Sequence, residues 1–314
     1  MKGANAIRRR VGDLALAEWS ERLASSGAGV RIGPFDMHLR VPIEALHDPL
    51  QRFYRDHPLL EGEHVYSCHA DLRRVWHVGR RPGRRIRFSV DGVAPHEDMP
   101  VGQGLAVLEW GLNLAIAMRF HGFFMLHAAV LERGGHALLM PASPGRGKTT
   151  LCAALAHRGW RLFSDEFGLV RPQERILTPV PRPMPLKNAS IEVLQKFAPE
   201  AELGPIIPET RKGTIAHVKP PRESIERAQE TAPPAWIVFP RWVADAPLAL
   251  EPVGGADAFM LLVTNAFNYE LLGEAAFTAA RAIVDQCQHF TLVYSDLAEA
   301  VAALTELADS HASQ

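Results

Sequence analysis

The chain has 314 residues, of which 47% are hydrophobic and 22% charged, and this balance is typical of folded proteins rather than disordered or fibrous ones. Lysine and arginine number 34 against 35 aspartates and glutamates, so the net charge of −1 provides no general attraction to nucleic acid or anionic lipid. The three cysteines lie far apart and form no CxxC pattern, which argues against a disulfide framework and a cysteine-built zinc site.

The sequence lacks clear signals for export or membrane insertion. The basic N-terminal segment is followed by an apolar stretch that Asp13 and Glu18 interrupt, so it does not fit a signal peptide. The most apolar region, residues 104–131, contains Glu109 and Arg119, so we expect no clean membrane span of about 20 residues. We therefore predict a cytoplasmic protein that has neither a membrane nor a nucleic acid as a partner.

The first third of the chain predicts α+β structure. Residues 30–41 and 65–78 alternate as strands do, and residues 84–90 predict a further short strand. Residues 43–56 have helical spacing, and residues 101–121 form the strongest helix candidate, with an apolar face. We expect this last helix to close an N-terminal domain.

The chain as a whole is predicted to have two domains of the α/β class. The smaller α+β domain would span residues 1–122, and the second would span residues 123–314. An arginine cluster near the last strand of the first domain is interpreted as a solvated hairpin tip, because no interleaved aromatic residues favour a phosphate or nucleic-acid patch. Its members are Arg80, Arg81, Arg84, Arg85 and Arg87.

The second domain begins with a predicted β-hairpin that runs into a glycine-rich loop. Two apolar runs, residues 126–132 and 136–141, flank a turn at Gly134 and Gly135. The loop ASPGRGKT follows, and a helical run then ends near Gly159. A strand, a glycine loop, a Gly-Lys-Thr sequence and a helix in this order are the context of a phosphate-binding P-loop.

Each residue type in the loop has a physical reason to be there. Gly145 and Gly147 allow backbone N–H groups to approach a phosphate, and the helix N-terminus behind them adds partial positive charge. Lys148 supplies a cation for the β- and γ-phosphates, and the Thr149 hydroxyl is a ligand for Mg²⁺. The first consensus glycine is replaced by Ala142, and a glycine-rich turn that binds nothing remains the alternative. The predicted ATP-binding residues are Ser143, Pro144, Gly145, Arg146, Gly147, Lys148, Thr149 and Thr150.

A pair of carboxylates follows the predicted P-loop helix. Asp165 and Glu166 lie between two apolar runs, residues 160–163 and 167–170. Carboxylates at this place can hold Mg²⁺ or take a proton from a hydroxyl. The alternative is a solvated surface pair, but the position directly after a P-loop helix favours a functional role.

The tight turn before the loop also separates the chain from common P-loop proteins. In those proteins the neighbouring strands are parallel and are reached through crossovers of about a dozen residues or more. Here the strand that precedes the loop strand must be antiparallel to it. We therefore do not expect a motor, GTPase or transporter ATPase.

These motifs, in this order, resemble the catalytic half of HPr kinase/phosphorylase. The shared string runs from His127 through the loop at residues 141–149 and the Arg158-Gly159 pair to Ser164 and the acidic pair at 165–166. The chain is still more similar to the bacterial HPr kinase-related kinase A group. That similarity includes PRPMPLKNASIEV, PETRKGTIAHVKPP, WIVFPRW and NAFNYELLG, and it covers roughly residues 28–305.

The resemblance implies a fold like that of phosphoenolpyruvate carboxykinase, binding of ATP and Mg²⁺, and phosphoryl transfer to a hydroxyl acceptor. It implies that Asp165 is the catalytic base, that Glu166 is its acidic catalytic neighbour and that His127 is a catalytic histidine near the phosphate site. The predicted metal ligands are Thr149 and Asp165. The family's paired aspartates are here Asp-Glu, and the downstream segment that completes true HPr kinases does not align. HPr itself is therefore not expected to be the acceptor.

Four cationic residues are candidates to stabilise charge during transfer. Arg182 and Lys187 lie in a proline-rich loop, and Arg211 and Lys212 lie in PETRKGT. Lys187 and Arg211 are favoured as catalytic, because loops carry function. Ordinary surface charge is the alternative for each of them.

Two C-terminal segments are interpreted as structural. One is a helical stretch with an apolar face that includes Asn265, Asn268, Tyr269 and Glu270. The other is an amphipathic helix that Asp296 caps.

Three functions remain open at this stage. The favoured one is a kinase for a hydroxyl of a peptide, a small protein or a small molecule. The second is a nucleotide-gated binding module without transfer, and the third is a bifunctional kinase and phosphorylase. A homo-oligomer is left open as well.

Overall fold

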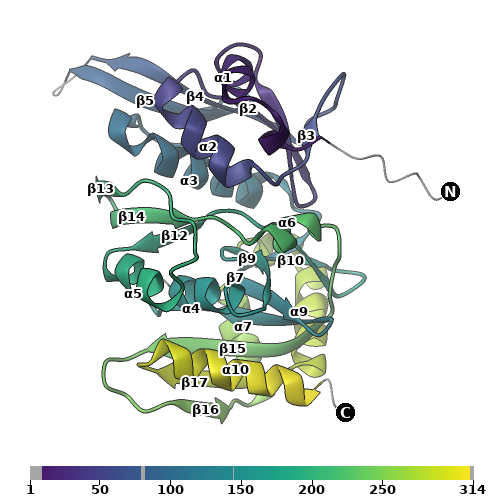
Figure 1. Ribbon diagram of the computed structural model, residues 1–314. Coiled ribbons are helices and arrows are strands. Elements are labelled where there is room, and N and C mark those ends of the chain that lie inside the picture. The colour runs from purple at the N-terminus through teal and green to yellow at the C-terminus, as the bar shows by residue number, and fades with distance from the viewer. Residues whose placement is uncertain (1–8, 79–81, 144, 312–314) are drawn as a thin grey trace.

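The computed structural model describes residues 9–78, 82–143 and 145–311. It has a six-stranded sheet in the N-terminal part, an eight-stranded sheet in the C-terminal part and a three-stranded sheet between them (Figure 1). Both larger sheets combine parallel and antiparallel strands. The predicted α/β class with a mixed sheet is therefore confirmed.

The N-terminal sheet has the strand order β3-β1-β2-β4-β5-β6. Its neighbours are antiparallel except for the parallel pair of β2 and β4. The helices α1, α2 and α3 pack on it and share one core with it. The bounds are α1 (Leu16–Ala24), β1 (Ala28–Ile32), β2 (Phe35–Arg40), α2 (His47–Tyr54), β3 (Leu59–Leu60), β4 (Cys68–His77), β5 (Gly83–Val90), β6 (Met99–Pro100) and α3 (Gly104–Arg119).

The strands and helices expected in this part are confirmed, with two exceptions. Helix α1 lies before the first predicted element and was not foreseen. Arg84, Arg85 and Arg87 lie on strand β5 rather than at a hairpin tip, whereas Arg80 and Arg81 lie outside the described residues.

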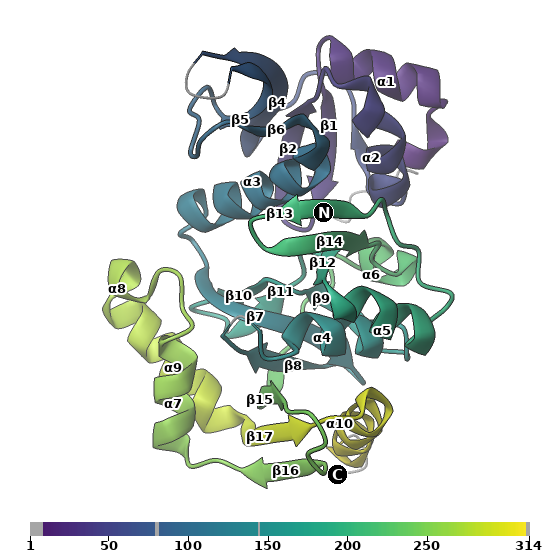
Figure 2. The same cartoon turned by 90° about the vertical axis from the view of Figure 1, so that its left-hand side faces the viewer.

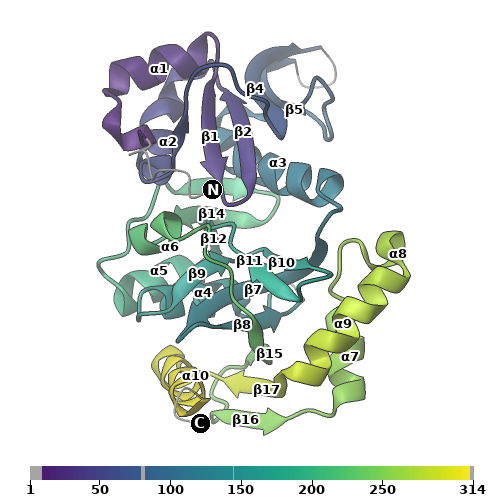
Figure 3. The ribbon, with the colours of Figure 1, turned by 90° about the vertical axis from the view of Figure 1, so that its right-hand side faces the viewer.

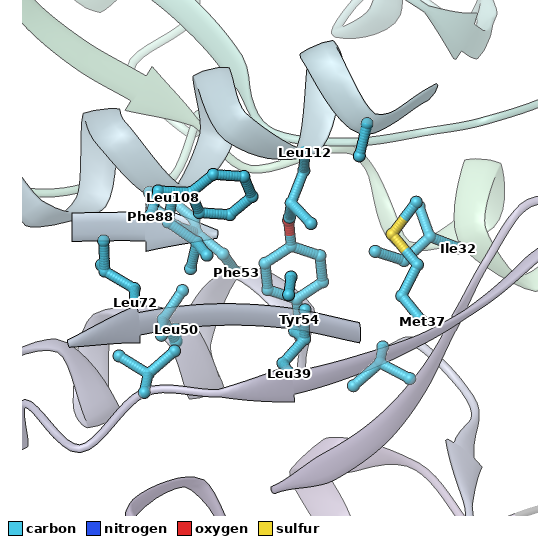
Figure 4. Packing of buried hydrophobic residues seen from close by; sticks show 14 of the residues in the cluster. Ile32, Met37, Leu39, Leu50, Phe53, Tyr54, Leu72, Phe88, Leu108 and Leu112 are labelled. Carbon is cyan, nitrogen blue, oxygen red and sulfur yellow. The ribbon is translucent and has the colours of Figure 1, made fainter. Parts of the chain in front are cut away.

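The N-terminal core extends into the C-terminal part of the chain. Figure 4 shows Phe53 and Tyr54 of α2 packed among residues of the sheet and of α3. The same cluster of buried side chains includes Met125 and Phe167 from the second part. The boundary expected between residues 122 and 123 falls in the turn between α3 and β7 and stays a prediction.

Helix α3 is a long and strongly apolar helix. Together with the preceding turn it spans Val101–Arg119, which is long and apolar enough to cross a membrane by length and composition, contrary to the expectation from the sequence. In this fold 61% of the span is buried, and Glu109 within it is 2% exposed. The helix thus serves as the core helix of the N-terminal part.

The large sheet has the strand order β11-β10-β7-β8-β15-β17-β16, and β9 pairs with β7 beside β10. The hairpin of β7 and β8 is antiparallel, as predicted, whereas β15 is parallel to both β8 and β17. The bounds are β7 (Phe124–Arg133), β8 (His136–Pro141), β9 (Arg161–Ser164), β10 (Phe167–Arg171), β11 (Ile176–Thr178), β15 (Pro234–Trp242), β16 (Ala249–Pro252) and β17 (Gln288–Tyr294).

Helices cover both faces of the large sheet (Figure 3). One face packs against α4 (Lys148–Ala156), α5 (Ala189–Phe197) and α10 (Leu297–His311), and the other against α7 (Gly255–Val263) and α9 (Glu274–Gln286). The Asp296 carboxylate accepts hydrogen bonds from the amides of Ala298 and Glu299, so the predicted cap of the last helix is confirmed.

The three-stranded sheet lies between α3 and α4 (Figure 2). Its order is β12-β14-β13, with antiparallel neighbours. The bounds are β12 (Met184–Lys187), β13 (Ile207–Thr210) and β14 (Gly213–Val218), and the short helix α6 (Arg222–Glu226) follows.

The predicted helical stretch around Asn265 is wrong in part. Helix α7 ends at Val263, and the next helix, α8 (Tyr269–Leu272), begins six residues later. The loop between them runs along strand β7, where the Asn268 side chain accepts a hydrogen bond from the Met125 amide at 2.9 Å and donates one to the Phe123 carbonyl at 2.8 Å. The backbone of this loop forms hydrogen bonds with β7 in place of the hydrogen bonds of a helix. The stretch is therefore not a continuous helix. The structural role expected for Asn268 is confirmed.

Candidate active site

The glycine-rich loop connects β8 to α4, as the sequence predicts. Gly145 and Gly147 have φ angles of +85° and +88°, which a side chain would strain. No side chain caps the N-terminus of α4 among the described residues, so its first amides are available to a ligand. The loop therefore has the backbone properties of an anion cradle.

Residues from distant strands fix the end of the loop. The Trp242 amide donates to the Arg146 carbonyl at 3.0 Å, and the Tyr294 hydroxyl donates to the Gly147 carbonyl at 3.3 Å. A Cβ added to Gly147 would lie 2.6 Å from the Tyr294 hydroxyl, so only glycine fits here. The sequence did not indicate that Trp242 and Tyr294 belong to the site, although Trp242 is the last residue of the WIVFPRW string.

The predicted nucleotide residues lie together on the loop and the first turn of α4. Lys148 is buried, Thr149 and Thr150 are half-buried, and Ser143 and Arg146 are exposed. Pro144 lies outside the described residues. The Lys148 ammonium donates a hydrogen bond of 2.6 Å to the backbone carbonyl of Asp165, which connects the helix to the acidic turn.

The acidic pair lies in the tight turn between β9 and β10. The Ser164 hydroxyl accepts hydrogen bonds from the amides of Glu166 at 3.1 Å and Phe167 at 2.9 Å, which is the serine turn that shapes this bend. Ser164 is 3% exposed and supports the turn rather than the chemistry. Asp165 and Glu166 follow strand β9, which itself follows helix α4. This is the position that the sequence predicts for them.

Asp165 is the most unusual group of the site. It is 6% exposed, and neither of its carboxylate oxygens makes a hydrogen bond of normal geometry with a described residue. Burial raises the pKa of Asp165, while the charge of Lys148 and the nearby Thr149 hydroxyl oppose the rise. A buried carboxylate without a partner is costly, so its retention points to a task such as taking a proton or holding a cation.

His127 lies beside Glu166 at the opening of the site. Its Nε2 atom is 3.6 Å from the Glu166 carboxylate, and its ring is 5.6 Å from that of Phe267. Burial, together with the charges of Lys148 and other lysines, lowers the pKa of His127 to about 4 despite the opposing carboxylate of Glu166. The imidazole is therefore neutral at pH 7.

Two further lysines reach the same place. Lys187 ends strand β12, and Lys212 lies in the turn between β13 and β14, with its ammonium 5.3 Å from the centre of the Trp110 ring. The positive charges of both lysines lower the pKa of His127. Desolvation of the amine and the charge of Lys187 lower the pKa of Lys212, although much of its side chain is exposed.

Arg211 is less well placed than its neighbour. Its side chain is exposed, and its charge is one of those that lower the pKa of Lys212. The sequence favoured Arg211, whereas the geometry favours Lys212. The residues that the structure brings together are thus His127, Lys148, Thr149, Asp165, Glu166, Lys187 and Lys212.

Arg182 is not a free cation of the site. It is 7% exposed, and its guanidinium lies 2.6 Å from the Glu109 carboxylate and also bonds Asn113. The Tyr54 hydroxyl donates to the same carboxylate at 2.7 Å. Arg182 therefore joins the proline-rich loop to helix α3, and the interpretation as a charge-stabilising residue is wrong because its charge is already paired.

The site offers few protein ligands to a metal. Within the described ranges no group of three histidine, cysteine, aspartate or glutamate side chains could hold an ion. Mg²⁺ commonly takes only one or two protein oxygens and completes its shell with water and phosphate oxygens. The adjacent Thr149 and Asp165 fit that mode of binding.

Comparison with known proteins does not extend this description. No protein-family model matches the chain, and no curated protein sequence is similar to it at a significant level.

Proposed function

We propose that the protein is an ATP- and Mg²⁺-dependent kinase with an HPr kinase-like fold. Its acceptor would be a hydroxyl group of a peptide, a small protein or a small molecule. The observation that carries the proposal is the buried, unpartnered carboxylate of Asp165, which lies beside the P-loop lysine at the start of α4.

The residues present suit a bound nucleotide. The positive φ angles of Gly145 and Gly147 and the uncapped start of α4 supply backbone donors, and Lys148 supplies the cation. Thr149 and Asp165 would hold Mg²⁺ through oxygen atoms. ATP with Mg²⁺ would supply the transferable phosphoryl group.

In this proposal Asp165 takes the proton of the acceptor hydroxyl. Burial raises its pKa, which makes it a stronger base than an ordinary aspartate. His127 is neutral and can accept or donate a hydrogen bond without adding charge. Lys187 and Lys212 would stabilise the charge that develops during transfer.

A nucleotide-gated switch and the reverse reaction are the competing functions. A switch requires the phosphate loop but has no use for a buried base, so the isolation of Asp165 favours transfer. Phosphorolysis would use the same residues in the opposite direction, and no separate observation favours it.

The test compares the wild type with Asp165→Asn, which keeps the shape of the side chain but removes the base. We expect the variant to bind ATP about as tightly and to transfer labelled phosphate on the order of 10²-fold more slowly. Candidate acceptors are the products of neighbouring genes and small hydroxyl compounds. Undiminished transfer by the variant would exclude Asp165 as the base, and absence of transfer by the wild type to every acceptor would favour the switch.

A second experiment addresses the metal. If Thr149 is a ligand of Mg²⁺, Thr149→Ser keeps the hydroxyl and should retain transfer, whereas Thr149→Val should lose it. A fully active valine variant would remove Thr149 from the metal site.

A further inference from the structure

The hairpin of β4 and β5 carries a concentration of positive charge far from the candidate active site. Residues 73–87 contain seven arginines and no carboxylate. Because the whole chain has a net charge of −1, the rest of the protein carries −1 − 7 = −8. In Figure 1 the hairpin extends beyond the other strands of its sheet. We name as the arginine arm its described residues Arg73, Arg74, Trp76, Arg84 and Arg85.

The strand register places like charges next to each other on the arm. Arg73 is directly opposite Arg87, and Arg85 lies diagonally beside Arg73 on the same face. Like charges directly opposite each other destabilise a sheet. The repulsion between these arginines lowers the stability of the free protein, and an anion bound against them would reduce it.

Several of the described arginines of the hairpin are not neutralised within the described part of the chain. Arg87 has a bidentate ion pair with Asp98 at 2.7 and 2.8 Å, but Arg73 is 3.8 Å from Asp71 and half exposed. Arg74, Arg84 and Arg85 have no ion pair or side-chain hydrogen bond with any residue in the described part of the chain. Three cations are thus available to a ligand.

The arm also offers an aromatic contact and a free strand edge. Trp76 is 66% exposed and lies opposite Arg84. Strand β2 pairs with β4 only from Cys68 to Asp71, so within residues 9–78, 82–143 and 145–311 the β4 edge from Arg73 onward has no strand partner. An unpaired edge is a template for another extended chain.

We propose that the arginine arm docks an extended acidic segment of a partner polypeptide, which adds as a strand along the free edge of β4. Carboxylates on one face of the partner strand would pair with Arg73 and Arg85, and an apolar residue on its other face would cover Trp76 beside Arg74 and Arg84. A nucleic acid fits less well, because one aromatic residue gives no row of stacking surfaces and the −8 charge of the remaining protein repels a long polyanion.

The test uses three fluorescent probes with the full-length protein. The first is a peptide of ten residues in which glutamate and valine alternate, the second has glutamine in place of glutamate, and the third is an oligodeoxythymidylate of equal charge. We expect the acidic peptide to bind at least about tenfold more tightly than the other two, and its binding to weaken as salt increases. The Trp76 emission, taken as the difference from Trp76→Phe, should shift on binding.

Charge removal provides the matched comparison. The variant with glutamine at positions 73, 74, 84 and 85 should lose at least about tenfold in affinity for the acidic peptide. A control variant with glutamine at four exposed arginines elsewhere, namely positions 52, 175, 222 and 281, should bind as the wild type does. Melting curves of both variants show whether the fold is retained.

Three results would overturn the proposal. They are equal affinity for the acidic and neutral peptides, tighter binding of the oligonucleotide than of the acidic peptide, and equal losses in the arm variant and the control variant. The proposal does not depend on the kinase assignment, because none of these measurements involves ATP.

Discussion

Lys148 and Asp165 are joined directly, because the ammonium of the first residue of α4 donates a 2.6 Å hydrogen bond to the Asp165 backbone carbonyl. The bond fixes the cation of the phosphate loop relative to the turn that carries the acidic pair. It also leaves the Asp165 carboxylate without a strong partner, since the lysine bonds the backbone and not the side chain. In the proposed kinase, this contact would hold the phosphate-binding cation next to the residue that accepts the proton.

Removal of Lys148 should greatly weaken the response of the protein to nucleotide. ATP with Mg²⁺ stabilises a protein that binds it only when folded, so the melting temperature of the wild type should rise with ATP concentration. Lys148→Ala should lose most of this rise, because the main cation for the phosphates is gone. Lys196→Ala, at an exposed position on α5, is the control and should respond as the wild type does. Equal rises in all three proteins would contradict the P-loop assignment.

Substitution of Asp165 should stabilise the protein at neutral pH. Its folded-state pKa is raised, so between the unfolded value of about 3.8 and the raised value the folded state binds a proton that the unfolded state lacks. Stability from this group therefore falls as pH rises through that window, and at pH 7 the buried charge is a cost. Asp165→Asn removes the cost.

The measurement is the melting temperature of both proteins from pH 4 to 8 without nucleotide or Mg²⁺. We expect Asp165→Asn to melt higher at pH 7, and the difference to shrink as the pH falls toward 4. Asp285→Asn, at an exposed position, should show no such trend. A wild type that melts higher than Asp165→Asn at pH 7 would show that the carboxylate is paired.

The sequence predicted those parts of the site that lie close together along the chain. The hairpin before the loop, the helix that begins at Lys148 and the strand ends around Asp165 follow from apolar periodicity and from the glycines. These signals are local, and the backbone has few ways to satisfy them. The class of the fold was therefore predictable.

The parts that the sequence did not reveal depend on contacts between distant residues. Tyr294 reaches the carbonyl of Gly147 across 147 positions, and Arg182 is paired with Glu109 across 73. No local pattern indicates that Arg182 will be buried, because its burial depends on Glu109, which helix α3 supplies. The same reason explains why Lys212, rather than Arg211, reaches the site, since Trp110 of α3 holds it.

The buried pair of Glu109 and Arg182 should be strongly coupled in stability. Arg182→Met leaves the Glu109 carboxylate buried without its cation, and loss of one partner of a buried ion pair costs about 3–5 kcal/mol. Replacement of both residues, in Glu109→Leu with Arg182→Met, should cost much less than the two single changes together. Urea denaturation of the four proteins measures the coupling. Additive costs would show that the pair is not a unit.

The cations of the β13–β14 turn should differ in their effect on catalysis. Lys212 is among the charges that lower the pKa of His127, whereas the Arg211 side chain is exposed. In the proposed kinase, Lys212→Ala should therefore lower kcat by about tenfold or more, and Arg211→Ala should change it little. The pH profile gives a second readout, because the lowered pKa of Lys212 predicts a loss of activity on the alkaline side below its ordinary value of 10.5. Lys212→Arg keeps its charge at higher pH and should remove that decline. A larger loss in Arg211→Ala than in Lys212→Ala would instead assign the catalytic charge to Arg211, as the sequence first indicated.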